Sequence, residues 1–110
     1  MHEPTVCLLL TTCADADTAL RLGRSLVDAR LAACASVLPP MTSIYRWQGV
    51  IEQASEVQLV AKTTTAAQAA AIEHIRTHHP YQVPEILAVP VSDGLPAYLA
   101  WVAENTSEDR

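Results

Sequence analysis

The pattern of hydrophobic positions predicts a strand and then a helix at the start of the chain. Residues 5–13, TVCLLLTTC, are almost continuously apolar, as in a strand covered on both faces. Asp15 or Asp17 can then cap a helix that we expect to continue to about Leu31. Gly23 costs that helix about 1 kcal/mol relative to alanine, which close packing on a sheet would offset. The apolar stripe of the helix has a spacing of three or four residues and consists of Ala19, Leu22, Leu26, Ala29 and Ala33.

The middle of the chain predicts a long β-hairpin. Residues 33–47 and 50–63 have strand-like composition, and Gln48-Gly49 between them is suited to a tight turn. Apolar and more polar residues alternate over 57–62, so we expect the base of the second strand to be at least half-buried. Residues 52–56 are polar, and we expect them to face water or a polar neighbour.

A second helix is expected to end just before Pro80, because proline disfavours helical dihedral angles in the residue that precedes it. Its first residue can be capped by Thr64 or Thr65, and its last turn lies near His78 or His79.

The remaining pattern predicts a strand over 85–91 and a last helix that residues 93–96 open. The order of elements is therefore βαββαβ with an added helix. This order predicts an α+β, ferredoxin-like split βαβ fold with an antiparallel sheet and its helices on one face. The length corresponds to a single domain over 1–110, with an ordered core at 5–106 and a tail at 107–110 that frays.

The predicted hairpin is longer than the domain that carries it. A strand of about 14 residues spans roughly 45 Å, whereas a domain of this length has a radius of gyration of about 13 Å. Pro39-Pro40 cannot donate to a ladder, so a bend is expected there. Beyond the bend, large apolar side chains would have little of their own domain beneath them: Ile44, Tyr45, Trp47 and Ile51. We infer that the outer hairpin packs on another copy of the chain; the alternative is that it curls back over its own sheet.

Composition is that of a compact globular protein, with 50% hydrophobic and 17% charged residues. A formal charge of -5 and a pI near 5.2, without a Lys/Arg cluster, argue against nucleic acid as a partner. The apolar run over 6–10 is too short for a signal sequence or a membrane span, so we expect a cytoplasmic protein with no membrane partner. Cys7, Cys13 and Cys34 are odd in number and lack CxxC spacing, which favours free thiols.

Catalytic signatures are missing from the sequence. Glycines occur only at 23, 49 and 94, so neither GxGxxG nor a Walker loop can be formed, and no HExxH or nucleophile elbow is present. We expect no enzyme activity and no organic cofactor.

Several ordered motifs together resemble the CutA family of divalent-cation tolerance proteins. They are VLPPMTSIYRWQGVIE, VQLVAKTT, HHPYQVPEILAVPV and YLAWV, and the resemblance extends over essentially the whole chain. It implies a ferredoxin-like subunit in a homotrimer built through the long hairpins, similar in shape to the PII signalling trimers. It also implies a role in tolerance of copper and other divalent metals.

The same resemblance implies a copper site made by a cysteine at the end of the first strand and the His-His pair before Pro-Tyr. Aligned on TTCADADTA, the cysteine position falls on Thr11, whose hydroxyl is a poor ligand for Cu2+ or Cu+ compared with a thiolate. The pair itself is present as His78 and His79. Cys13 lies two residues beyond Thr11 on the same strand face, and could replace the missing thiolate if the strand end bends toward the histidines.

The histidine spacing leaves more than one metal site open. On a helix, His74 and His78 are neighbours on one face and can chelate a metal together. Adjacent His78 and His79 would point about 100° apart, and could converge only if the helix unwinds before Pro80. A structural role near a helix C-terminus is the alternative for these side chains.

A polar and aromatic set lies within the most recognisable motifs: Tyr45, Arg46, Lys62, Tyr81, Glu85 and Trp101. These residues can form interface ion pairs and aromatic anchors of an oligomer. Alternatively, Arg46 and Lys62 can hold an anion between subunits, and Tyr81 and Glu85 are the other two candidates for such an effector cleft.

Three hypotheses follow. The first is a homotrimeric divalent-cation tolerance protein that responds to metal ions and binds copper. The second is a PII-like signalling trimer that binds a small anionic effector in intersubunit clefts. The third is a scaffold without a ligand that contacts an unidentified protein partner.

Overall fold

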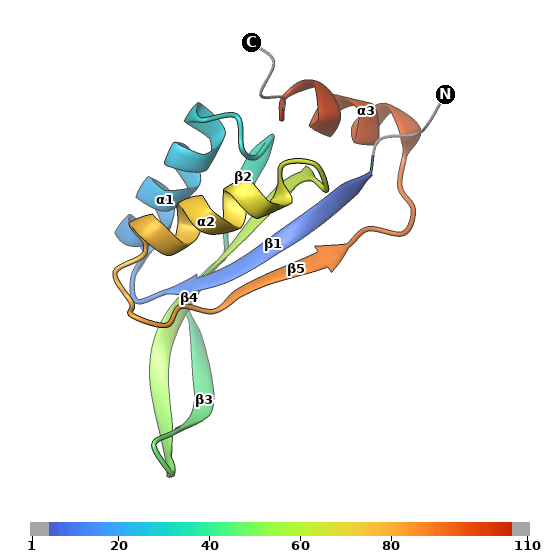
Figure 1. The fold of residues 1–110 in the computed structure, drawn as a ribbon. Coiled ribbons are helices and arrows are strands. Elements are labelled where there is room, and N and C mark those ends of the chain that lie inside the picture. Colours follow the sequence, from blue (N-terminus) through green and yellow to red (C-terminus); the bar gives the residue numbers. More distant parts are fainter. Residues whose placement is uncertain (1–4, 107–110) are drawn as a thin grey trace.

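The computed structural model describes residues 5–106, which form an antiparallel sheet and three helices (Figure 1). The elements are β1 (Val6–Cys13), α1 (Ala16–Asp28), β2 (Cys34–Val37), β3 (Met41–Trp47), β4 (Val50–Thr64), α2 (Gln68–His78), β5 (Ile86–Pro90) and α3 (Pro96–Glu104). The strand order is β2-β4-β1-β5, and β3 pairs with the outer part of β4. The predicted α+β, split βαβ fold is confirmed. Within residues 5–106, no helix is long and apolar enough to cross a membrane.

The core lies between one face of the sheet and the two helices α1 and α2, which cover that face together (Figure 1). β1 lies inside the sheet between β4 and β5, where Leu9 pairs with Ala61 of β4 and Ala88 of β5. Leu9, Leu26 and Ile75 are almost fully buried, and each such side chain contributes about 1.5–3 kcal/mol relative to an exposed position. Burial of these side chains therefore holds both helices on the sheet.

Helix α1 starts as predicted and ends earlier than predicted. Asp15 accepts a hydrogen bond from the backbone N–H of Thr18 at 2.8 Å, which satisfies one of the free donors of the first turn. The expected end at Leu31 is wrong, because Arg30 adopts a positive φ of 60°. The N–H of Leu31 then donates a hydrogen bond to the carbonyl of Leu26, and the N–H of Arg30 donates one to the carbonyl of Val27. This is the pattern of a Schellman motif.

Gly23 brings α1 close to the sheet. A Cβ at this position would lie 3.1 Å from the Cβ of Ala35 on β2 and 3.2 Å from Cδ1 of Leu59 on β4. The close packing expected to offset the helical cost of this glycine is therefore present.

Helix α2 begins later than expected. Thr64 is still in β4, and its hydroxyl accepts a hydrogen bond from the N–H of Ala67, which stabilises a turn ahead of the helix. The predicted cap at Thr64 or Thr65 is wrong for this reason: the helix begins at Gln68. Its end at His78 agrees with the sequence prediction, and His79 is already extended, with ψ of 136°, as Pro80 requires.

The hairpin extends beyond the body of the domain (Figure 1). The first predicted strand is divided into β2 and β3 around Pro39-Pro40, which confirms the expected bend. Gln48 and Gly49 both have positive φ, as in a type I′ turn. The longest dimension of the domain is 51 Å against 26 and 23 Å for the other two. Ile44 is 69% exposed and Trp47 52%, so the hairpin does not curl back over its own sheet.

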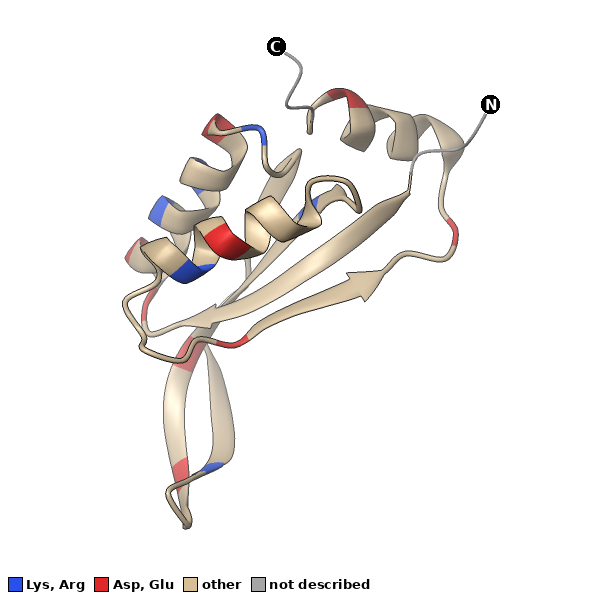
Figure 2. Ribbon diagram, in the orientation of Figure 1, with Lys and Arg blue, Asp and Glu red and all other residues tan. Residues whose placement is uncertain are grey.

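The remaining helix, α3, packs at the end of the sheet where β1 starts, as the ribbon shows (Figure 1). Leu99 and Val102 form a second small core with Val6 and Ala33. Charged residues are frequent on α1 and α2 and absent from β1 and β5 (Figure 2). The two strands that bear no charge are thus covered on one face by helices that do.

Candidate metal centre and cleft

Cys13 and His79 lie together where β1 and α2 end. The Sγ of Cys13 is 3.9 Å from Nε2 of His79. That nitrogen is also 2.7 Å from the carbonyl oxygen of Thr12, and the other ring nitrogen, Nδ1, accepts from the N–H of Tyr81 at 3.1 Å. A carbonyl oxygen can only accept, so Nε2 carries the proton and Nδ1 the lone pair. Both nitrogens of this buried imidazole are occupied by backbone groups.

The Cys13 thiol is held in its neutral form. Its side chain is fully buried, and burial raises the pKa of the thiol, which the charges of Asp15 and Glu56 raise further. Metals bind the thiolate, and a raised pKa disfavours it. Thr11, at the family's cysteine position, is also buried, and its hydroxyl has no hydrogen-bond partner among the described residues.

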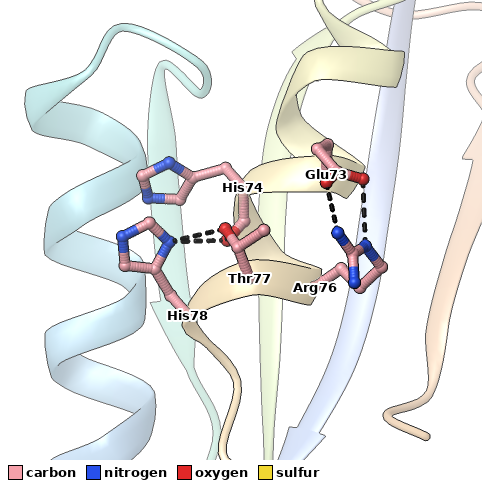
Figure 3. Close-up of polar contacts among 5 residues, drawn as sticks. All are labelled: Glu73, His74, Arg76, Thr77 and His78. Atoms are coloured by element: carbon pink, nitrogen blue, oxygen red, sulfur yellow. Dashed lines mark hydrogen bonds and ion pairs between the residues drawn. The ribbon is translucent and has the colours of Figure 1, made fainter.

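His78 lies apart from His79 and next to His74. Its ring is exposed and stacks on His74, with 4.1 Å between ring centroids and 21° between planes (Figure 3). Nδ1 of His78 lies 2.8 Å from the carbonyl oxygen of His74 and 3.1 Å from the hydroxyl of Thr77. Nε2 of His74 lies 2.9 Å from the hydroxyl of Ser25 on α1. Partial burial lowers the pKa of His74, and the neighbouring charge of His78 lowers it further.

The predicted copper ligands therefore do not converge. The subunit brings Cys13 and His79 together and leaves His78 stacked on His74, on the side of α2 that faces α1. Within residues 5–106, no group of three or more His, Cys, Asp or Glu side chains is placed to hold one metal ion. Within the described subunit, the cysteine and His-His site implied by the resemblance is not assembled, because His78 stacks on His74 and both ring nitrogens of His79 are engaged by backbone groups.

A cleft of about 700 Å³ lies between the hairpin and the segment that follows α2. Its walls carry aromatic rings and carboxylates and, among the described residues, neither lysine nor arginine. The lining residues are Thr12, Ser43, Ile44, Tyr45, Trp47, Glu52, Ala54, Glu56, Tyr81, Gln82, Val83 and Glu85. Burial raises the pKa of the Tyr81 hydroxyl, and Glu56 adds to this effect. The electrostatic character of the cleft is acidic.

Two of the four effector candidates, Tyr81 and Glu85, line this cleft, and two do not. Arg46 lies near the hairpin turn, where its guanidinium donates to the carbonyl of Gly49 at 3.5 Å. Lys62 pairs with Leu8 at the other end of β4. Since Arg46 pairs with Ile51, about 35 Å of strand separates the two cations. One subunit cannot hold an anion with both.

The proposed interface residues are exposed in the subunit. Ile44, Tyr45 and Trp47 project from β3, and Trp101 on α3 is 40% exposed with its ring stacked on Tyr98. The Tyr98 hydroxyl lies 3.8 Å from the Sγ of Cys34. Cys34 itself is half-buried, because β2 is an edge strand.

Comparison with known proteins gives a consistent result. The family described as CutA1 divalent ion tolerance protein matches residues 7–105. A divalent-cation tolerance protein CutA from Citrobacter koseri is 44% identical over 99 residues, which are 90% of this chain and 86% of the relative. Another from Salmonella newport has the same identity and coverage.

Solved structures of similar proteins have the same fold. CutA from Xylella fastidiosa has a TM-score of 0.90 and 46% identity, and the match covers 93% of this chain and 98% of that one. CutA1 from Oryza sativa has a TM-score of 0.92 and 31% identity, and the match covers 97% of this chain and 98% of that one. A structure from Archaeoglobus fulgidus, described as a periplasmic divalent cation tolerance protein CutA, has a TM-score of 0.89 and 29% identity. That match covers 93% of this chain and 99% of the other. The chain belongs to the CutA1 divalent ion tolerance family.

Proposed function

We propose that this protein is a homotrimeric, PII-like member of the family that acts in the cytoplasm in the response to metal ions. It acts by binding copper or another divalent cation rather than by catalysis. Membership of a divalent ion tolerance family is the observation that carries the proposal. The half-buried thiol of Cys34 favours a reducing compartment.

The trimer is supported by the shape of the subunit. Ile44, Trp47 and Ile51 are each more than half exposed on a ribbon that extends past the domain. A two-stranded ribbon is marginal in water by itself, and aromatic and aliphatic residues are the usual core of subunit interfaces. Packing between hairpins would bury these side chains and complete the walls of the clefts.

Mass measurement tests the assembly. Light scattering on the purified protein should give three times the subunit mass of 11.9 kDa. The double variant Ile44→Glu/Ile51→Glu places two charges in the interface and should yield monomers, whereas Leu20→Glu on the outer face of α1 should remain trimeric. A wild-type monomer at micromolar concentration would reject the trimer.

Growth and ligand stabilisation test the role. A strain without the gene should lose tolerance to copper or another divalent metal, and the wild-type gene should restore it. Thermal shift with a panel of divalent metals should raise the melting temperature by mass action. Stabilisation by nucleotides or organic acids instead would support the anion-binding alternative through Arg46 and Lys62, and no shift in either panel would support a scaffold. Cell fractionation tests the compartment.

A further inference from the structure

We propose that His74 and His78 form a two-imidazole chelate for a late first-row divalent metal ion on the side of α2 that faces α1. This site differs from the His78 and His79 pair of the family motif. Its biological meaning rests on the proposed metal-ion response, whereas its chemistry rests on the geometry of α2 alone.

The helix already holds the two rings together. His74 and His78 are four residues apart within α2, a spacing that places side chains next to each other on one face. The rings are stacked with 4.1 Å between centroids, and both extend from α2 toward α1 (Figure 3). Only side-chain rotations are needed for one ion to contact both imidazoles, so the backbone cost of forming the site is low.

His78 has the protonation pattern of a metal ligand. Its Nδ1 lies 2.8 Å from the backbone carbonyl oxygen of His74, which can only accept a hydrogen bond. In the neutral ring the proton is therefore on Nδ1, and the lone pair is on Nε2 of an exposed side chain. Metal-bound imidazoles typically donate the other ring N–H to a carbonyl or carboxylate in this way.

His74 is restrained by Ser25, and this contact competes with metal binding. The Ser25 hydroxyl donates its single proton to the carbonyl of Leu22 at 2.8 Å. Its oxygen must then accept from Nε2–H of His74 at 2.9 Å. An ion that takes the Nε2 lone pair of His74 requires that proton to leave or move to Nδ1, and the bond to Ser25 breaks. Ser25 therefore weakens the site.

The chemical class of the ion follows from the ligands. Neutral imidazoles suit Cu2+, Ni2+ and Zn2+, with Cu2+ bound most tightly. The described residues place no third His, Cys, Asp or Glu with this pair, so water completes the coordination. Such a site exchanges its ion readily.

The experiment is calorimetric titration with Zn2+, which is redox-inert and leaves the three cysteines reduced. His74→Ala and His78→Ala should each weaken binding at least about tenfold, since each removes one of two nitrogen donors. Ser25→Ala should tighten binding about two- to tenfold, the net worth of one hydrogen bond. A histidine-selective NMR spectrum with Zn2+ should shift the His74 and His78 ring signals together.

Matched variants separate this site from the others. His79→Gln should bind Zn2+ as the wild type does, and so should His2→Ala and Cys34→Ser, which remove competing donors. Equal weakening by His78→Ala and His79→Gln with no effect of His74→Ala would overturn the proposal in favour of the family pair. If His74→Ala/His78→Ala abolishes Zn2+ binding but still restores metal tolerance to the deletion strain, the site stands and its link to the metal-ion response fails. A deletion strain with unchanged metal tolerance would instead reject the proposed function and leave the site standing.

Discussion

The imidazole of His79 lies 2.7 Å from the backbone carbonyl oxygen of Thr12, across 67 positions of sequence. This contact joins the residue after α2 to the end of β1, and the second ring nitrogen accepts a hydrogen bond from the N–H of Tyr81. A side chain that the motif presents as a metal ligand is therefore a buried cross-link between two elements.

Replacing His79 should destabilise the fold. We expect His79→Ala to lower the free energy of unfolding by about 1–3 kcal/mol, because the carbonyl of Thr12 loses its buried donor. His78→Ala, at an exposed position, should change it by less than about 0.5 kcal/mol. Urea denaturation at one fixed chain concentration measures both, and equal losses would contradict the assignment.

Thr11 and Thr63 are two buried threonines that differ in hydrogen bonding. Both are buried, but the hydroxyl of Thr63 donates to the carbonyl of Leu31 at 2.7 Å, whereas that of Thr11 has no partner among residues 5–106. Thr11→Val should stabilise the protein by about 1 kcal/mol, because valine fills the same volume without an unpaired polar group. Thr63→Val should cost about 1–3 kcal/mol, since it leaves the carbonyl of Leu31 unpaired. Thermal and urea unfolding of the two variants should change in opposite directions.

Gly23 should resist the substitution that helix propensity favours. Alanine gains about 1 kcal/mol in a helix interior, but its methyl group would press on Ala35 and Leu59 at 3.1 and 3.2 Å. We expect Gly23→Ala to lower the melting temperature slightly and Gly23→Leu to lower it strongly. Arg24→Ala, on the exposed side of the same helix, is the control and should have little effect. A stabilised Gly23→Ala would mean that α1 can move away from β2 without loss.

The depressed pKa of His74 gives stability a defined pH dependence. Because partial burial and His78 lower this pKa below its ordinary value of 6.5, the unfolded state binds a proton more readily than the folded state. The contribution of His74 is therefore complete above pH 6.5 and is lost as the pH falls through the lower, folded value. Melting curves from pH 7.5 down to pH 5 should show this loss, and His74→Gln should show less of it. An identical pH profile for the variant would contradict the prediction.

Local signals in the chain were sufficient for most of the backbone. The apolar run of β1, the cap at Asp15, the bend at Pro39-Pro40 and the turn at Gln48-Gly49 each depend on neighbouring residues. The end of α1 and the start of α2 were predicted wrongly, because at each of them a helical conformation competes with another backbone arrangement. Arg30 adopts a left-handed conformation usually given to glycine, and Thr64 remains in β4 because its strand partner is Val6.

The sequence by itself determined the order of elements and the overhanging hairpin, because backbone periodicity and proline chemistry act over a few residues. Only the tertiary structure decided which polar groups meet. His79 contacts the carbonyl of Thr12, and His74 contacts the hydroxyl of Ser25. The cleft has an acidic wall, and Lys62 does not line it. These partners come from separate elements, and their distances are set by how the helices pack on the sheet, which no local pattern encodes.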